Sequence, residues 1–181
     1  TGKTYSVLMT IDKRLQLGLI RPGHILVICP ATILENWVQK EIATHTPHLT
    51  AEIITGSYSD RLNMIMSRTK DIYLTNFETF SMKSKMTFGG REVDVPLAPL
   101  FNMCEWDMIV IDEAHKIKNP EAIRTKQIVK TFRGVKYSII MSGTINANKL
   151  YDLHTPFVFL NGAKQFNSLH QERSTGKLYE H

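Results

Sequence analysis

The chain has 181 residues, of which 43% are hydrophobic and 22% charged, values typical of one globular domain with a sizeable core and not of a disordered segment. Its net charge of +5 favours a nucleic-acid partner, and its two cysteines are too few for a disulfide framework. No apolar run reaches transmembrane length and no leader pattern opens the chain, so we expect an intracellular, reducing compartment (nucleus, bacterial cytoplasm or virus-infected cell) and no membrane partner.

The first half of the chain alternates between helical and strand patterns. In chain order the spacing predicts a helix from about Thr4 to Gly18, a strand at 24–29, a helix opened by Ala31 or Thr32, a strand at 52–55, a helix carrying Leu62, Ile65 and Met66, and a strand at 71–75 followed by a helix with Phe77, Phe80 and Met82.

The second half interrupts this rhythm once. A small hairpin is predicted near 84–100, around the turn formed by Gly89 and Gly90. Then follow a strand at 108–111, a helix with Asn119 as N-cap, Pro120 at its first position and Val129 and Phe132 in the core, a strand at 137–141, and a helix at about 149–160 with core positions Leu150, Leu153, Phe157 and Phe159.

Strands that alternate with helices predict a three-layer α/β domain, in which a mostly parallel sheet carries helices on both faces. We expect this domain to span residues 1–160 and residues 161–181 to form a polar tail that begins an inter-lobe segment. A strand should precede the Gly-Lys-Thr sequence at the amino terminus and is missing here. We therefore expect a fragment in which strand edges are left unpaired.

The amino terminus resembles the end of a phosphate-binding loop. Gly2, Lys3 and Thr4 match the tail of the Gly-x-x-x-x-Gly-Lys-Ser/Thr pattern, in which backbone amides at a helix start cradle phosphates. Lys3 would then hold the β- and γ-phosphates, and the hydroxyl of Thr4 would ligate Mg²⁺. Gly-Lys-Thr alone fits an ordinary helix N-terminus equally well.

Two adjacent carboxylates end a strand that is predicted to be buried. Residues 108–111 are all apolar, and Asp112 and Glu113 follow at once. A carboxylate at the end of a buried strand is costly unless it meets a cation or hydrogen-bond donors. Asp112 is therefore predicted to bind Mg²⁺ and Glu113 to orient or deprotonate an attacking water. A surface turn with two solvated acids is the alternative, and the upstream Gly-Lys-Thr argues against it.

Four segments together resemble the motifs of the Swi/Snf-like double-stranded-DNA translocases, a group within the superfamily 2 helicases. They are Asp-Glu-Ala-His-Lys-Ile-Lys-Asn at 112–119, the Pro30, Leu34, Asn36 and Trp37 set, Leu-Thr-Asn-Phe-Glu at 74–78, and Met-Ser-Gly-Thr at 141–144 with Asn148 and Leu150. Their order and spacing agree over nearly the whole chain, so the resemblance implies the first RecA-like lobe of a P-loop ATPase.

The resemblance also implies roles for individual residues. Gly2, Lys3, Thr4, Asp112 and Glu113 would form the ATP and Mg²⁺ site; His115, Ser142, Gly143 and Thr144 would couple hydrolysis to movement; Pro30, Ala31 and Thr75 would contact the phosphates of a tracked DNA strand. A second RecA-like lobe of the same parent chain would complete the site. Trp37, from its spacing, is expected in the core, and Lys116 and Lys118 are expected in solvent or against phosphates.

Three positions depart from the family pattern. Ile145 and Ala147 replace a proline and a glutamine, and Glu41 falls one residue late after Trp37. Three alternatives stay open: an RNA helicase of the Asp-Glu-Ala-His class, a restriction-enzyme motor lobe, and a non-catalytic assembly module. Against the first, residue 143 is glycine where that class has alanine.

Overall fold

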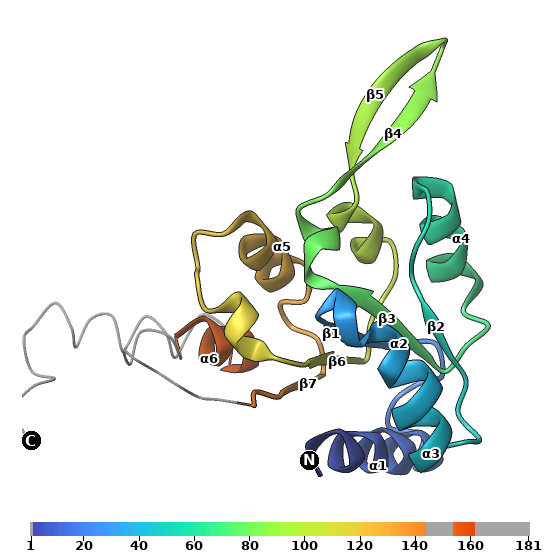
Figure 1. The fold of residues 1–181 in the computed structure, drawn as a ribbon, viewed down its shortest axis with the longest axis vertical. Helices are drawn as coiled ribbons and strands as arrows, with labels where there is room; N and C mark the ends of the chain where they lie inside the picture. Colours follow the sequence, from blue (N-terminus) through green and yellow to red (C-terminus); the bar gives the residue numbers. More distant parts are fainter. Residues whose placement is uncertain (1, 144–153, 162–181) are drawn as a thin grey trace, which may run out of the picture.

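The computed structural model describes residues 2–143 and 154–161, and five of its strands form one parallel sheet (Figure 1). The strand order is β2-β3-β1-β6-β7. The bounds are β1 Ile25–Cys29, β2 Ala51–Ile53, β3 Ile72–Asn76, β6 Met108–Ile111 and β7 Tyr137–Ile140. Each adjacent pair runs parallel, so all five strands end at the same edge of the sheet.

Helical segments cover both faces of this sheet. One set is α1 (Lys3–Gln16) with the continuous run η1 (Ala31–Ile33), α2 (Leu34–Asn36), η2 (Trp37–Ile42) and α3 (Ala43–His45). The other set is α4 (Tyr58–Ser67), η3 (Phe77–Phe80), η4 (Ala98–Asn102), η5 (Ala114–Ile117), α5 (Ile123–Thr131) and α6 (His154–Asn161). The three-layer α/β fold is confirmed.

The side chains of β1 show how one strand serves two cores. Ile25, Val27 and Cys29 pack with α1 and the 31–45 run, whereas Leu26 and Ile28 pack with α4, η3 and α5 on the opposite face. All five residues are fully buried. This is the continuous apolar pattern of a central parallel strand, with successive side chains on opposite faces.

The predicted insertion is an antiparallel hairpin that projects from the body (Figure 1). Its strands are β4 (Lys83–Phe88) and β5 (Arg91–Pro96), joined by Gly89 and Gly90, both with positive φ. The backbone N–H of Leu97 donates to the carbonyl of Met82 across 3.0 Å and closes the base of the hairpin. The hairpin thus starts and ends at neighbouring points of the domain.

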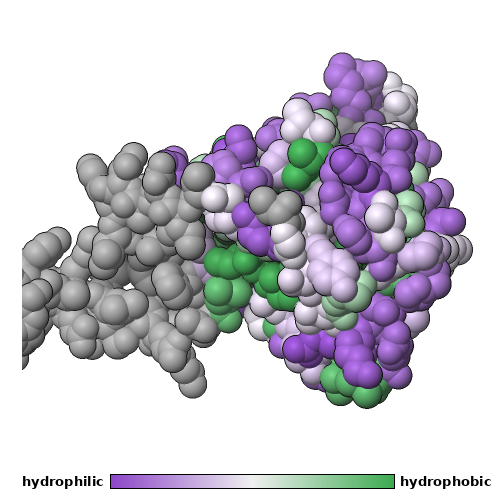
Figure 2. Space-filling model, turned by 60° about the horizontal axis from the view of Figure 1, so that its bottom comes forward, coloured by the Kyte–Doolittle hydropathy of each residue, from purple (hydrophilic) through white to green (hydrophobic). Residues whose placement is uncertain are grey.

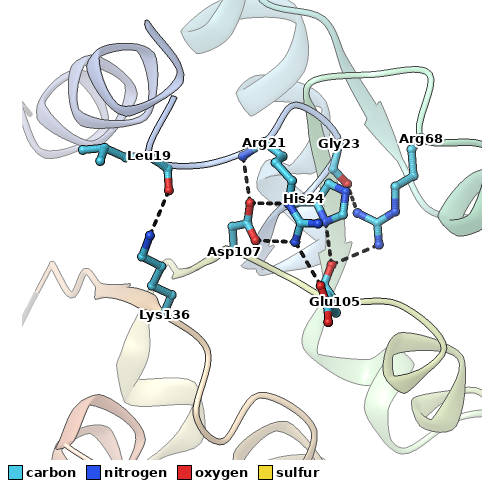
Figure 3. A network of polar contacts seen from close by, with 8 residues as sticks. All are labelled: Leu19, Arg21, Gly23, His24, Arg68, Glu105, Asp107 and Lys136. Carbon is cyan, nitrogen blue, oxygen red and sulfur yellow. Dashed lines mark hydrogen bonds and ion pairs between the residues drawn. The ribbon is translucent and has the colours of Figure 1, made fainter. Parts of the chain in front are cut away.

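A polar network ties the amino ends of β1 and β6 together at the sheet edge remote from Asp112 (Figure 3). The Arg21 guanidinium donates to both carboxylate oxygens of Asp107 at 3.0 and 2.7 Å, and the Arg21 backbone N–H donates to Oδ2 at 2.8 Å. Arg68 donates to the carbonyls of Gly23 and Glu105. The hydrogen bonds from Arg21, first of all from its guanidinium, and the Arg21 charge hold the pKa of Asp107 below its ordinary value.

Several local predictions were wrong. Asn119 does not cap the next helix: its side chain accepts from the N–H of Glu121, two residues on, so residues 119–121 form a turn. Ala122 is extended, and α5 begins only at Ile123. Val129 is only half-buried, whereas Ile128 is fully buried and Phe132 is buried as predicted. The strand predicted at 52–55 is Ala51–Ile53.

Two methionines that the sequence places on helices lie at the surface. Met66 and Met82 are 57% and 44% exposed, because α4 ends at Ser67 and the segment after β3 is a single 3-10 turn. Phe77 and Phe80 of that turn are buried, and so is Phe159 of α6. Leu150 and Leu153 and the tail at 162–181 lie outside the described residues.

The outer side of β7 has no neighbour among the residues that the structure describes. All four residues of β7 are half-buried, whereas those of β6 are fully buried. Figure 2 turns the lower side of Figure 1 toward the viewer and shows a largely hydrophilic surface with an apolar area beside the residues drawn in grey. None of the described helices is long and apolar enough to cross a membrane.

Candidate functional site

The residues predicted to bind the nucleotide and to act in its hydrolysis meet at the carboxyl edge of the sheet, where ligands of open α/β folds bind. Asp112 follows β6 directly, and Ser142 stands two residues after β7. Lys3 opens α1, and its ammonium group donates to the carbonyl of Ser142 across 3.3 Å. Residues 139 positions apart in sequence thus lie side by side.

Asp112 is held by donors on both carboxylate oxygens. The backbone N–H of Glu113 donates to Oδ1 at 2.9 Å, and the indole Nε1 of Trp37 donates to Oδ2 at 3.0 Å. Burial raises the pKa of the Asp112 carboxyl, and these two hydrogen bonds oppose that shift. A cation at this position would further favour the ionised form.

Glu113 adopts the left-handed backbone conformation, with φ 57° and ψ 55°. This conformation costs a non-glycine residue about 1–2 kcal/mol. It turns the chain from β6 into η5, and the N–H of Ala114 then donates to the carbonyl of Met141 at 2.8 Å. The strained residue therefore lies in a turn that a backbone hydrogen bond joins to the end of β7.

The Glu113 carboxylate contacts two residues of the predicted coupling set. Its Oε2 lies 3.1 Å from Nδ1 of His115 and accepts the backbone N–H of Gly143 at 3.3 Å. Glu113 is only partly exposed, and His115 is more exposed. Thr144 lies outside the described residues. The structure thus brings Glu113, His115, Ser142 and Gly143 together.

The start of α1 fits a phosphate group. The helix is 14 residues long, its first turn holds no acidic residue, and its N-cap, Gly2, has no side chain that could cap the first N–H groups. The first N–H groups of such a helix attract anions. Thr4 lies half-buried in this first turn.

The donor set fits Mg²⁺ better than a metal caged by protein ligands. The described residues contain no group of three or more His, Cys, Asp and Glu side chains that could hold a metal ion. Mg²⁺ in nucleotide sites is typically held by one or two protein oxygens together with phosphates and waters. Asp112 and the Thr4 hydroxyl are of that kind.

The three residues predicted to contact nucleic acid lie in different surroundings. Ala31 is exposed and Pro30 half-buried, both just beyond the end of β1. Thr75 is fully buried, and its hydroxyl donates to the Oγ1 of Thr79 at 3.1 Å. Of these three residues, Pro30 and Ala31 are accessible to a partner in this structure and Thr75 is not.

Trp37 was expected in the core, and it is buried there, but its contact with Asp112 was not foreseen. It is 1% exposed and begins a π-helical turn, Trp37–Ile42. Turns of this kind are rare and are frequent at functional sites.

A family model described as the SNF2-related domain matches residues 1–174 of the chain. A solved structure, the Sulfolobus solfataricus SWI2/SNF2 ATPase core in complex with dsDNA, superimposes with a TM-score of 0.69 at 30% sequence identity. It covers 92% of this chain and 32% of that one.

Curated relatives give the same result at lower identity. Protein CHROMATIN REMODELING 19 of Arabidopsis thaliana is 27% identical over 88% of this chain, and the ISWI chromatin-remodeling complex ATPase ISW1 of Saccharomyces cerevisiae is 29% identical over 92%. The chain spans only 21% and 15% of the length of these two relatives.

Proposed function

The chain belongs to the SNF2-related domain family, and we propose that it is the first RecA-like lobe of a DNA-dependent ATPase, the ATP-binding half of a double-stranded-DNA translocase. One observation carries this proposal: Lys3, Asp112 and Glu113 converge at one edge of a parallel sheet, beside the start of a long helix. Phosphoryl transfer depends mainly on positioning and on charge, and these residues supply both.

Each residue would have a separate task in the nucleotide site. Lys3 and the first N–H groups of α1, after Gly2, would hold the β- and γ-phosphates. Thr4 and Asp112 would hold Mg²⁺, which supplies charge neutralisation at the phosphates when it is bound. Glu113 would orient the attacking water or take its proton.

We propose that the contacts of the turn after β7 change when the nucleotide is hydrolysed. Gly143 and His115 both contact the Glu113 carboxylate, so a change in its charge or position alters both contacts. Ser142 faces Lys3 through its carbonyl. With Thr144, these residues would couple hydrolysis to movement along DNA.

Duplex DNA is the proposed partner. The Sulfolobus solfataricus SWI2/SNF2 ATPase core was solved in complex with dsDNA, and the net charge of +5 of this chain suits a polyanion. Pro30 and Ala31 would lie against the phosphates of one strand, where contacts position the protein without reading sequence. For Thr75 we propose only an indirect role, because its hydroxyl is buried.

A second lobe is proposed to complete the site. In superfamily 2 the arginine that stabilises the transition state comes from the other lobe, and the relatives named above are several times longer than this chain. The strand leading into Lys3 would lie beside β7, because Lys3 contacts Ser142, the second residue after the end of β7. Residues 1–160 would then be the lobe and 161–181 the start of the connection.

We infer an intracellular, reducing compartment for the whole protein. Cys29 and Cys104 are both free thiols in the structure. Burial raises the pKa of Cys29 to about 12, so this thiol stays protonated and unreactive.

ATP turnover by the full-length protein tests the proposal. Duplex DNA should stimulate turnover strongly and single-stranded RNA weakly, whereas the isolated 181-residue chain should show no turnover.

Other outcomes would favour other functions. Stimulation by RNA alone would favour an RNA helicase of the Asp-Glu-Ala-His class. DNA-stimulated turnover by the isolated chain would refute the need for a second lobe. A nuclease motif elsewhere in the parent chain would indicate a restriction enzyme, and a parent without a second lobe an assembly module.

A further inference from the structure

We propose that Trp37 is a positioning residue for the Mg²⁺ ligand Asp112, acting through its indole N–H. This inference rests on the proposed function, since it concerns the same nucleotide site. The two residues stand 75 positions apart, and the Nε1–Oδ2 distance is 3.0 Å. Trp37 does not contact the nucleotide in this proposal; it acts only on the carboxylate.

The hydrogen bond fixes the rotation of the Asp112 carboxylate. The backbone N–H of Glu113 donates to Oδ1, and the indole N–H of Trp37, from a different element, donates to Oδ2. A carboxylate has about four lone-pair sites, so two donors leave about two free. The two free lone-pair sites would face a bound ion and its waters in one fixed orientation.

The indole itself is rigidly held. Trp37 is 1% exposed, and it belongs to the core cluster that includes Val27 and Cys29 of β1 and Val110 of β6. A buried side chain of this size loses rotational freedom through packing. The donor is therefore set in place by the sheet that also carries Asp112.

The chain contains a second buried tryptophan, whose indole N–H donates to a backbone carbonyl and not to a carboxylate. Trp106 is 7% exposed, and its Nε1 donates to the carbonyl of Phe101 at 2.9 Å. Trp106 thus has similar burial and a similar hydrogen bond, but it lies in the opposite core cluster. It provides a matched control for Trp37.

The test measures nucleotide binding by the full-length protein, not turnover. A fluorescent, non-hydrolysable ATP analogue is titrated in Mg²⁺ and again in EDTA, and the ratio of the two Kd values gives the Mg²⁺ advantage. Trp37→Phe should reduce that advantage about tenfold, the lower end of the loss that partners of metal ligands typically cause. The Kd in EDTA should not change, and Trp106→Phe should change neither value.

An unchanged Mg²⁺ advantage in Trp37→Phe would overturn the proposal, whether the two Kd values stay the same or rise by an equal factor. Failure of the wild-type protein to bind the analogue in either condition would instead overturn the proposed function, and this inference with it. If Trp37→Phe does not fold, benzothienylalanine at position 37 keeps the ring shape and removes only the N–H donor. The same loss of Mg²⁺ advantage is then expected.

Discussion

Gly143 donates its backbone N–H to Oε2 of Glu113 across 3.3 Å, which joins two segments 30 residues apart in sequence. The same oxygen lies 3.1 Å from Nδ1 of His115. A single carboxylate oxygen therefore links the end of β6 to the turn after β7. Any change at Glu113 acts on both segments.

Replacing Glu113 with glutamine should separate binding from chemistry. Glu113→Gln keeps the shape of the side chain but removes its negative charge and its ability to accept a proton. We expect ATP affinity to stay within about threefold and turnover of the full-length protein to fall at least about 100-fold. Nucleotide titration and phosphate release measure the two quantities. Glu121→Gln, at an exposed acid paired with Lys126, is the control and should behave as wild type. Retained turnover in Glu113→Gln would remove Glu113 from the water-positioning role.

The N–H of Gly143, not its lack of a side chain, should be what matters. A Cβ at residue 143 would meet its nearest atom, Oε1 of Glu113, at 3.4 Å, which is ordinary contact. Gly143→Ala should therefore keep DNA-stimulated turnover within about threefold, whereas Gly143→Pro, which lacks the N–H, should lower it at least about tenfold. Equal activity of the two variants in a steady-state ATPase assay would show that the hydrogen bond is dispensable.

The Arg21–Asp107 pair should stabilise the fold in a pH-dependent way. The side chain of Arg21 is 53% exposed, so Arg21→Ala should cost only about 1 kcal/mol at neutral pH. The pKa of Asp107 is lowered in the folded state, so this stabilisation is present above the ordinary value of 3.8 and is lost as pH falls through the folded pKa. Urea unfolding at pH 7 and at the acid limit of folding measures the difference. Lys136→Ala, at a lysine that donates to the Leu19 carbonyl in the same network, should show no such pH dependence.

The hairpin should be removable. The Leu97 N–H already donates to the Met82 carbonyl, so replacing residues 83–96 with Asn-Gly gives a four-residue β-turn closed by that bond. We expect a loss of less than about 1 kcal/mol and unchanged basal ATP turnover. Part of that loss comes from Ser84, whose hydroxyl accepts the N–H of Tyr58, and Ser84→Ala measures this part alone. Collapse of the domain on deletion would show that the hairpin belongs to the core fold.

The sequence located the sheet edge and most of the residues on it, because apolar runs define parallel strands and the motifs stand at their ends. Asp112 and Glu113 follow β6, and Lys3 opens α1, as predicted. The predicted helix start at Asn119 was wrong because asparagine caps turns as readily as helices. Here its side chain accepts the N–H of Glu121, two residues on, as in a turn. Only the tertiary structure decides between these uses.

The role of Trp37 could not be found from hydrophobic spacing, which places a ring in a core but does not locate its polar N–H. One signal was present in the sequence. Glu41 falls one residue late after Trp37, and the structure has a π-helical turn over Trp37–Ile42. The side-chain amide of Asn36, just before this turn, donates to the side-chain carboxylate of Glu41 at 3.4 Å. A π turn holds one residue more than an α turn, so it accommodates the extra residue while Trp37 stays beside Asp112.

The half-buried strand β7 has a practical consequence for anyone who produces this lobe. One side of β7 pairs with β6, and among the described residues the other side presents a row of unpaired N–H and C=O groups. Such an edge is a template for pairing with a second chain. The isolated lobe should therefore self-associate as its concentration rises, and a co-expressed or fused strand that covers β7 should keep it monomeric in light scattering.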